Sequence, residues 1–216
     1  MAGNADAAIT LVRDLTSKTA LDQLESLLQG RKPFAMPVTA LEVGGFNAIP
    51  DAMVLCLRER LNLPVPSGKI MQSNKVAHTK SDGWHRLVTP ATFTGAVVAG
   101  ADYLLIDDHV GFGGTLANLR GHIEINGGHV LGMMALTETG GGREIAVRQE
   151  TLSMLQAKHG RELTQFWRAV FEHGIDCLTN VEAGYLHRVE SVDTIRTRMA
   201  QATERARRRG VSAIEV

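Results

Sequence analysis

Two adjacent carboxylates followed at once by a glycine-rich loop are the residues of this chain best suited to chemistry. Residues 104–115 read Leu-Leu-Ile-Asp-Asp-His-Val-Gly-Phe-Gly-Gly-Thr. The apolar start predicts a buried strand that ends at Asp107 and Asp108. Carboxylates bind sugar hydroxyls or a metal ion, and free backbone N–H groups at a helix start bind phosphate. The pattern favours a ligand that has both groups, a phosphorylated sugar.

The loop itself offers backbone donors and one hydroxyl. Gly111, Gly113 and Gly114 permit sharp turns and a close approach of N–H groups to an anion. Thr115 can donate a hydrogen bond to phosphate and cap the following helix, whose dipole attracts negative charge. Any strand–loop–helix turn favours Asp, Gly and Thr for local reasons, but the acidic pair together with three glycines and a threonine is a more specific combination.

Two other phosphate-binding motifs compete for this loop. A P-loop requires a lysine after its glycines, and none follows Gly114. A dinucleotide fingerprint would need glycine where Leu116 stands, although Glu138 lies near the distance expected of a ribose-binding acid. An NAD(P)-binding oxidoreductase therefore remains an alternative, but it does not explain the two acids before the loop.

The elements that must position this loop alternate along the chain. Apolar spacing predicts a helix over 11–28, a strand over 34–41, a helix over 50–61 and a strand over 63–66. A polar excursion over 67–92 follows. The pattern then predicts a strand over 103–107, a helix over 116–126 and a strand over 129–136. This alternation predicts an α/β fold with a parallel sheet flanked by helices. Loops 42–47, 107–115 and 137–143 should meet at the carboxyl edge of the sheet, where such folds bind ligands.

The two ends of the chain have a different character. Helical spacing recurs over 150–158, 163–173, 181–185 and 192–209. We therefore predict a helical N-terminal segment over 1–33, an α/β core over 34–145 and a helical C-terminal extension over 146–216. Within the excursion, strand-like fragments at 75–78 and 86–89 bracket a turn at Ser81-Asp-Gly, which predicts a long hairpin that could close over the sheet edge.

The composition narrows the class of partner. The formal net charge is zero, so the chain as a whole has no attraction for nucleic acid or anionic membranes. No apolar run approaches the roughly 20 residues of a membrane span, and residues 1–6 lack the basic start and apolar core expected of a signal peptide. Cys56 and Cys177 have no paired spacing, which favours reduced thiols in a cytoplasmic protein. The basic run 205–209 is expected to be a solvated helix end, with a nucleic-acid contact as the minority hypothesis.

Residues 103–115 resemble the phosphoribosyl-diphosphate (PRPP) binding motif of type I phosphoribosyltransferases, with four apolar residues, two acids, two further residues and a short loop rich in Thr and Gly. The resemblance extends over about 34–140, because Glu42-Val-Gly-Gly is similar to the family's pyrophosphate loop and Phe93, Gly95 and Gly100 also fit. It implies a phosphoribosyltransferase-like α/β core, with the helical extension as the hood over the base, and a homodimer.

The resemblance also implies a role for each candidate residue. Asp107 and Asp108 would contact the ribose hydroxyls of PRPP, directly or through Mg²⁺, with Asp107 as the metal-side carboxylate. Backbone groups would cradle the 5-phosphate along Gly111, Phe112, Gly113, Gly114 and Thr115. Further N–H groups would bind the pyrophosphate at Val43, Gly44 and Gly45. A flexible loop over 73–86 would close over the pyrophosphate through Lys75, Lys80 or Arg86.

Two departures from the family pattern bear on the reaction. Members often have Thr or Ser at the positions of Gly111 and Phe112, so those hydroxyl contacts are lost while the backbone donors remain. Some purine-specific members have an aspartate where Gly111 stands, which argues against hypoxanthine–guanine specificity here. We therefore expect a phosphoribosyltransferase that acts on a nucleobase or related nitrogen nucleophile, with a non-catalytic sensor of PRPP or nucleotide as the alternative.

Overall fold

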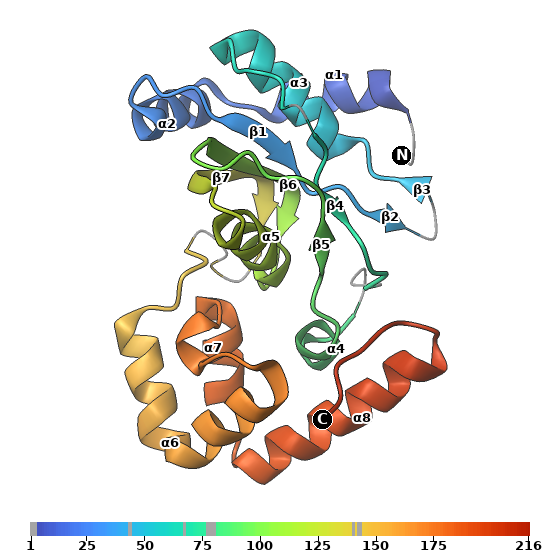
Figure 1. Ribbon diagram of the computed structural model, residues 1–216, viewed down its shortest axis with the longest axis vertical. Coiled ribbons are helices and arrows are strands. Elements are labelled where there is room, and N and C mark those ends of the chain that lie inside the picture. Colours follow the sequence, from blue (N-terminus) through green and yellow to red (C-terminus); the bar gives the residue numbers. More distant parts are fainter. Residues whose placement is uncertain (1–3, 43–44, 67, 77–80, 140, 142–143) are drawn as a thin grey trace. The chain divides into compact units, whose positions relative to one another are not determined.

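The computed structural model describes residues 4–42, 45–66, 68–76, 81–139, 141 and 144–216 (Figure 1). Their contacts divide into two compact units. Unit 1 comprises the described residues of 1–75, 92–109 and 118–137. Unit 2 comprises those of 76–91, 110–117 and 138–216. Each unit is treated below by itself.

A three-stranded parallel sheet forms the centre of unit 1. Strands β1 (Phe34–Pro37), β6 (Asp102–Val110) and β7 (His129–Glu138) lie in the order β1-β6-β7, and Ala35 is paired with Leu104 in the parallel register of β1 and β6. The apolar residues 103–106 are at most 1% exposed, because both faces of a parallel sheet are covered. The predicted α/β class, with a parallel sheet flanked by helices and a helical C-terminal part, is confirmed.

Helices cover both faces of this sheet (Figure 1). Leu104 and Ile106 belong to one apolar cluster with α1 (Ala5–Leu15), α2 (Lys18–Leu28) and α3 (Ile49–Leu61). Because strand side chains alternate, Tyr103 points to the other face. There it lies near Ile123 of α5 (Gly114–Ile125), since a Cβ added at Gly128 would meet both side chains within 3 Å.

Several element boundaries differ from the sequence predictions. The helix predicted over 11–28 is two helices, because Ser17 begins α2 by accepting a hydrogen bond from the backbone N–H of Ala20. The strand predicted over 63–66 is wrong, since no strand forms there and its prolines lack the N–H donor that a ladder needs. Two short antiparallel pairs were not predicted: β2 (Leu41–Glu42) with β3 (Gly45–Phe46), and β4 (Met71–Gln72) with β5 (Phe93–Thr94).

Unit 2 is helical. Helix α4 (Gly83–Val88) packs on α8 (Val192–Arg208), and α6 (Gln149–Phe171) packs on α7 (Asn180–His187), with a 3-10 turn at Ile175–Cys177 between them in the chain (Figure 1). Helix α6 joins the two helices predicted over 150–173 across a kink at Gly160, whose φ of 59° suits glycine. The core is built from large apolar side chains that include Leu155, Leu163, Trp167, Leu186, Ile195 and Met199.

The strand predicted over 86–89 is wrong, because these residues belong to α4 and its end. Asp82 accepts a hydrogen bond from the backbone N–H of His85 at 2.8 Å and caps the helix. An N-cap carboxylate stabilises the first turn by satisfying one of its unpaired donors. None of the helices in the described part of the chain combines the length and apolar character needed to span a membrane.

Candidate functional site

The acidic pair lies within β6 rather than after it, since the strand continues to Val110. Both aspartates are half-buried. Asp107 Oδ1 accepts a hydrogen bond from the backbone N–H of Asp108 at 2.9 Å, and Asp108 Oδ2 accepts one from Asn47 Nδ2 at 2.9 Å. Asn47 Oδ1 in turn accepts from the backbone N–H of Ile49, the first residue of α3. The orientation of Asp108 is thus fixed from the start of a helix that is distant in sequence.

His109 follows the acidic pair on the same strand and is exposed. Its Nδ1 lies 2.8 Å from Thr137 Oγ1, and this hydroxyl also donates to the backbone carbonyl of Asp108. His109 and Thr137 therefore join the ends of β6 and β7.

The glycine loop is held within unit 2. Gly113 has a φ of 83°, a backbone conformation that glycine adopts at little energetic cost and that residues with a side chain rarely adopt. The carbonyl of Phe112 accepts a hydrogen bond from Thr179 Oγ1 at 2.6 Å. Helix α5 begins at Gly114, so Thr115 lies inside the first turn, and the expectation that it caps the helix is wrong. The first backbone N–H groups of a helix have no intrahelical acceptor and remain donors for an anion.

Arg86 supplies positive charge beside this loop. A Cβ added at Gly111 would lie 3.5 Å from Arg86 Nη1, and the guanidinium carbon is 5.9 Å from the centre of the Phe112 ring. Burial lowers the pKa of Arg86, yet an arginine stays charged near neutral pH. Among the candidate residues, the structure therefore brings Arg86, Gly111 and Phe112 together.

The remaining candidates are the residues expected at the pyrophosphate. Val43, Gly44 and Lys80 lie outside the described residues. Gly45 belongs to β3, where it pairs with Glu42. Lys75 is exposed. Their roles towards a pyrophosphate stay predictions.

A half-buried carboxylate beside the loop, Glu182, was not found from the sequence. Glu182 Oε2 accepts from the backbone N–H of Thr179 while Thr179 Oγ1 accepts from that of Glu182, which is the reciprocal capping box of α7. The other oxygen, Oε1, would lie 2.7 Å from a Cβ added at Gly114. Burial raises the pKa of Glu182 above its ordinary value of 4.5. The spacing Thr179-Asn-Val-Glu182 was the available signal.

Replacing Glu182 by glutamine tests this interpretation. Because the pKa of Glu182 is raised in the folded state, the folded protein holds this proton more tightly than the unfolded chain does. The contribution of Glu182 to the free energy of unfolding is therefore highest below pH 4.5 and falls as the pH rises through the folded-state pKa. Glutamine keeps the cap and removes the buried charge. We expect Glu182→Gln to unfold at a higher urea concentration than wild type at pH 7 and to lose this pH dependence.

Urea unfolding followed by circular dichroism between pH 4 and 8 measures both effects. Glu204→Gln is the matched control, because Glu204 is exposed and pairs with Arg208 at the surface. A Glu182→Gln variant that is less stable than wild type at pH 7 would contradict the assignment of Glu182 as a destabilising buried charge.

The chemistry of the acidic pair suits a hard divalent cation, since Mg²⁺ is bound by carboxylates together with phosphate oxygens and water. Within the described residues, no group of three or more His, Cys, Asp or Glu side chains could hold a metal ion by itself. A Mg²⁺ ion at Asp107 or Asp108 would therefore complete its coordination with water or with oxygen atoms of a bound phosphate compound.

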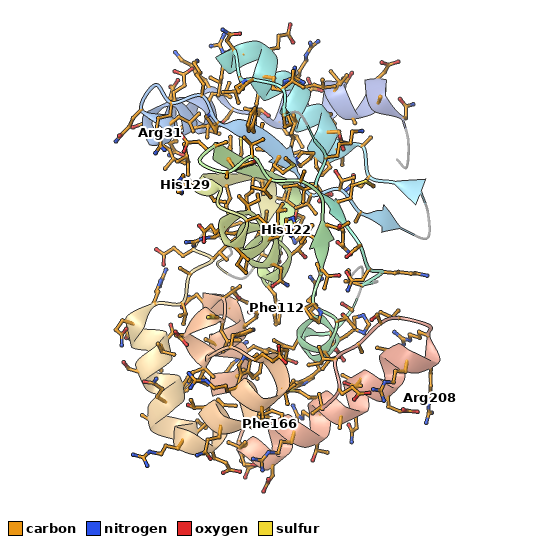
Figure 2. The ribbon with its side chains drawn as sticks, viewed as in Figure 1. Arg31, Phe112, His122, His129, Phe166 and Arg208 are labelled. Atoms are coloured by element: carbon orange, nitrogen blue, oxygen red, sulfur yellow. The ribbon has the colours of Figure 1, made fainter. Side chains whose placement is uncertain are left out.

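The basic run at the end of α8 is largely paired. Arg207 Nη2 lies 3.0 Å from Glu215 Oε1, and Arg208 Nε lies 2.8 Å from Glu204 Oε1. Figure 2 shows Arg208 on the outer side of α8. These carboxylates neutralise much of the charge that a nucleic-acid contact would use, so the arrangement favours a solvated helix end.

The comparisons with known proteins find a curated protein that is similar in sequence and solved structures that are more remotely similar. No family model matches the chain. The Escherichia coli protein named TraN is 42% identical over 204 residues, which cover 94% of this chain and 45% of TraN. The chain thus spans less than half the length of this curated relative.

Solved structures of phosphoribosyltransferases are also similar to the chain. A crystal structure of adenine phosphoribosyltransferase has a TM-score of 0.39 and 18% identity, over 62% of this chain and 71% of that protein. A Trypanosoma cruzi hypoxanthine phosphoribosyl transferase has a TM-score of 0.38 and 12% identity, over 67% of this chain and 71% of that protein.

Proposed function

We propose that this protein binds Mg²⁺-PRPP at residues 107–115 and transfers ribose 5-phosphate to a nitrogen of a nucleobase-like acceptor, with release of pyrophosphate. The observation that carries the proposal is the order of groups along the chain. Asp107 and Asp108 lie near the carboxyl end of a buried parallel strand, and a glycine loop leads from that strand to the start of α5. Ligands of open α/β sheets bind at this end of the strands.

The proposed reaction exchanges one bond at C1 of the ribose for another. The C1–O bond breaks with its electron pair leaving on pyrophosphate, and the acceptor nitrogen forms the C1–N bond and loses its proton. The transition state resembles an oxocarbenium ion, so the protein must hold the sugar and stabilise the leaving group. Asp107 and Asp108 would hold the ribose hydroxyls, and Lys75 and Lys80 would neutralise the pyrophosphate.

A sensor that binds PRPP without transferring it is the second candidate. The observation that favours it is the packing of Phe112, which stands where the family often has a hydroxyl. Its ring contacts that of Tyr185 with 5.2 Å between centroids and lies under the Arg86 guanidinium. Such a loop retains backbone donors and the Thr115 hydroxyl for the 5-phosphate, but it lacks side-chain hydroxyls at Gly111 and Phe112.

Two measurements separate these functions. Calorimetry with PRPP and Mg²⁺, beside NAD⁺ and NADP⁺, is expected to show binding of PRPP alone; binding of a dinucleotide without PRPP would contradict both candidates. A pyrophosphate-release assay against a panel of nucleobases then distinguishes the transferase from the sensor. Release of pyrophosphate with at least one base supports the transferase. Binding of PRPP with no release of pyrophosphate on any base favours the sensor.

Replacing Arg86 by glutamine should weaken PRPP binding by about 10-fold or more, because a hydrogen bond to a charged group contributes about 1.5–3 kcal/mol. Calorimetry measures the change. Arg120→Gln is the control, since Arg120 is exposed on α5 and pairs with Glu124. Equal PRPP affinity in the two variants would exclude Arg86 from the phosphate site.

A further inference from the structure

Unit 2 contains a cavity that none of the residues 107–115 lines. Its volume is about 270 Å³, and it lies among α4, the end of α7 and the start of α8. The lining side chains are two aromatic rings, two arginines and three smaller or acidic groups: Trp84, Tyr185, Arg188, Val189, Glu190, Thr194 and Arg198. This combination favours a ligand that is negatively charged and has an aromatic ring.

The two arginines are held over ring faces. The guanidinium carbon of Arg198 is 5.7 Å from the Trp84 ring centre, and that of Arg188 is 5.8 Å from the Tyr185 ring centre. Neither arginine forms an ion pair with a carboxylate of the described residues. A guanidinium placed on an aromatic ring keeps its in-plane N–H donors available for an anion.

The nearby acids leave the cavity positive. Glu190 lines the cavity and offsets one arginine. Burial raises the pKa of Tyr185, and the negative charge of Asp82 raises it further, while Arg198 and Arg188 lower it. The charge of Asp82 is compensated from outside the cavity by Arg205, at 3.6 Å. One positive charge therefore remains in excess.

The walls also suit a planar ring. The rings of Trp84 and Tyr185 meet edge to face with 5.0 Å between centroids, so the walls combine aromatic surface with the two guanidinium groups. The volume is slightly below the roughly 300 Å³ at which small-molecule sites usually begin, so the ligand must be small.

We propose that this cavity is a second binding site, which takes a small anion with a planar ring, of the nucleoside monophosphate class. The phosphate would bind Arg188 and Arg198, and the base would lie against Trp84 and Tyr185. The cavity and the proposed PRPP site share no lining residue, although the Tyr185 ring that lines the cavity also contacts Phe112 of the glycine loop.

Trp84 fluorescence reports on this site directly. The protein has two tryptophans. Both are buried, at 6% exposed for Trp84 and 1% for Trp167, but of the two it is Trp84 that lines the cavity, so added AMP or UMP is expected to quench Trp84. The double variant Arg188→Gln/Arg198→Gln should weaken the quenching at least 10-fold. Arg196→Gln, on the same helix but paired with Glu162 and Asp193, should not. Asp107→Asn/Asp108→Asn should also leave it unchanged.

Three outcomes would overturn the proposal. They are quenching that survives in the double arginine variant, quenching lost in the aspartate variant, and orthophosphate that competes as well as the nucleotide. Arg188→Lys/Arg198→Lys provides a second test, because it keeps both charges but loses the planar fork and should also bind more weakly. Calorimetry of wild type with AMP checks the binding without relying on fluorescence.

Discussion

The double variant Asp107→Asn/Asp108→Asn is expected to abolish PRPP binding while leaving the fold intact. Each carboxylate loses its charge but keeps an oxygen that can accept the hydrogen bonds from Asn47 and from the Asp108 backbone. Hydrogen bonds to charged groups contribute about 1.5–3 kcal/mol each, so losing both should weaken binding by over 100-fold. Calorimetry with Mg²⁺ and PRPP measures this, and circular dichroism checks the fold.

Asp102→Asn is the matched control for this variant. Asp102 begins the same strand, far from its carboxyl end, and forms a two-point hydrogen-bonded ion pair with Arg31. Exposed or partly exposed pairs contribute at most about 1 kcal/mol, so this variant should bind PRPP as wild type does. Normal PRPP binding by the Asp107→Asn/Asp108→Asn variant would show that these carboxylates do not hold the ribose.

Gly95→Ala is expected to destabilise the protein by about 3 kcal/mol, among the larger effects of a single substitution. Gly95 follows β5 and has a φ of 133°, which a side chain rarely adopts. A Cβ there would lie within 3 Å of the Lys69 carbonyl oxygen and the Ile70 Cα, and both are backbone atoms. Neither neighbour can move away by a side-chain rotation, so β5 or the chain at Lys69 must shift.

Urea unfolding measures the change in the free energy of unfolding. Gly121→Ala is the control, because nothing lies within 4 Å of a Cβ at this position in α5. Alanine is favoured over glycine inside a helix by up to about 1 kcal/mol, so the control should match or exceed wild type. A Gly95→Ala variant within about 0.5 kcal/mol of wild type would show that the turn after β5 relaxes freely.

The sequence predicts the sheet well because its strongest signals are local. Four consecutive apolar residues before Asp107 are enough to indicate a buried parallel strand, and β6 is found there. Helices α7 and α8 also follow from apolar spacing. Helix α4 was mistaken for a strand because six residues give too short a window for periodicity, and its cap at Asp82 was interpreted as a hairpin turn.

Only the part of the candidate site that is contiguous in the sequence can be predicted from the sequence. The acids and the glycine loop can be recognised because they are contiguous. Asn47, which orients Asp108, and Glu182, which lies beside Gly114, are distant in the sequence and meet the site only through the tertiary fold. No local pattern connects them to the loop. Arg86 was chosen as a candidate for a mobile hairpin and is found in a helix beside Gly111.

The hydrogen bond from the Thr179 hydroxyl to the Phe112 carbonyl joins residues that are 67 positions apart in the sequence. During synthesis, a ribosome therefore makes the glycine loop long before it makes the helix cap that holds it. Contacts of large sequence separation form late and slow folding. The loop can reach the described conformation only once α7 has emerged, so the glycine loop should be among the last parts of the molecule to mature.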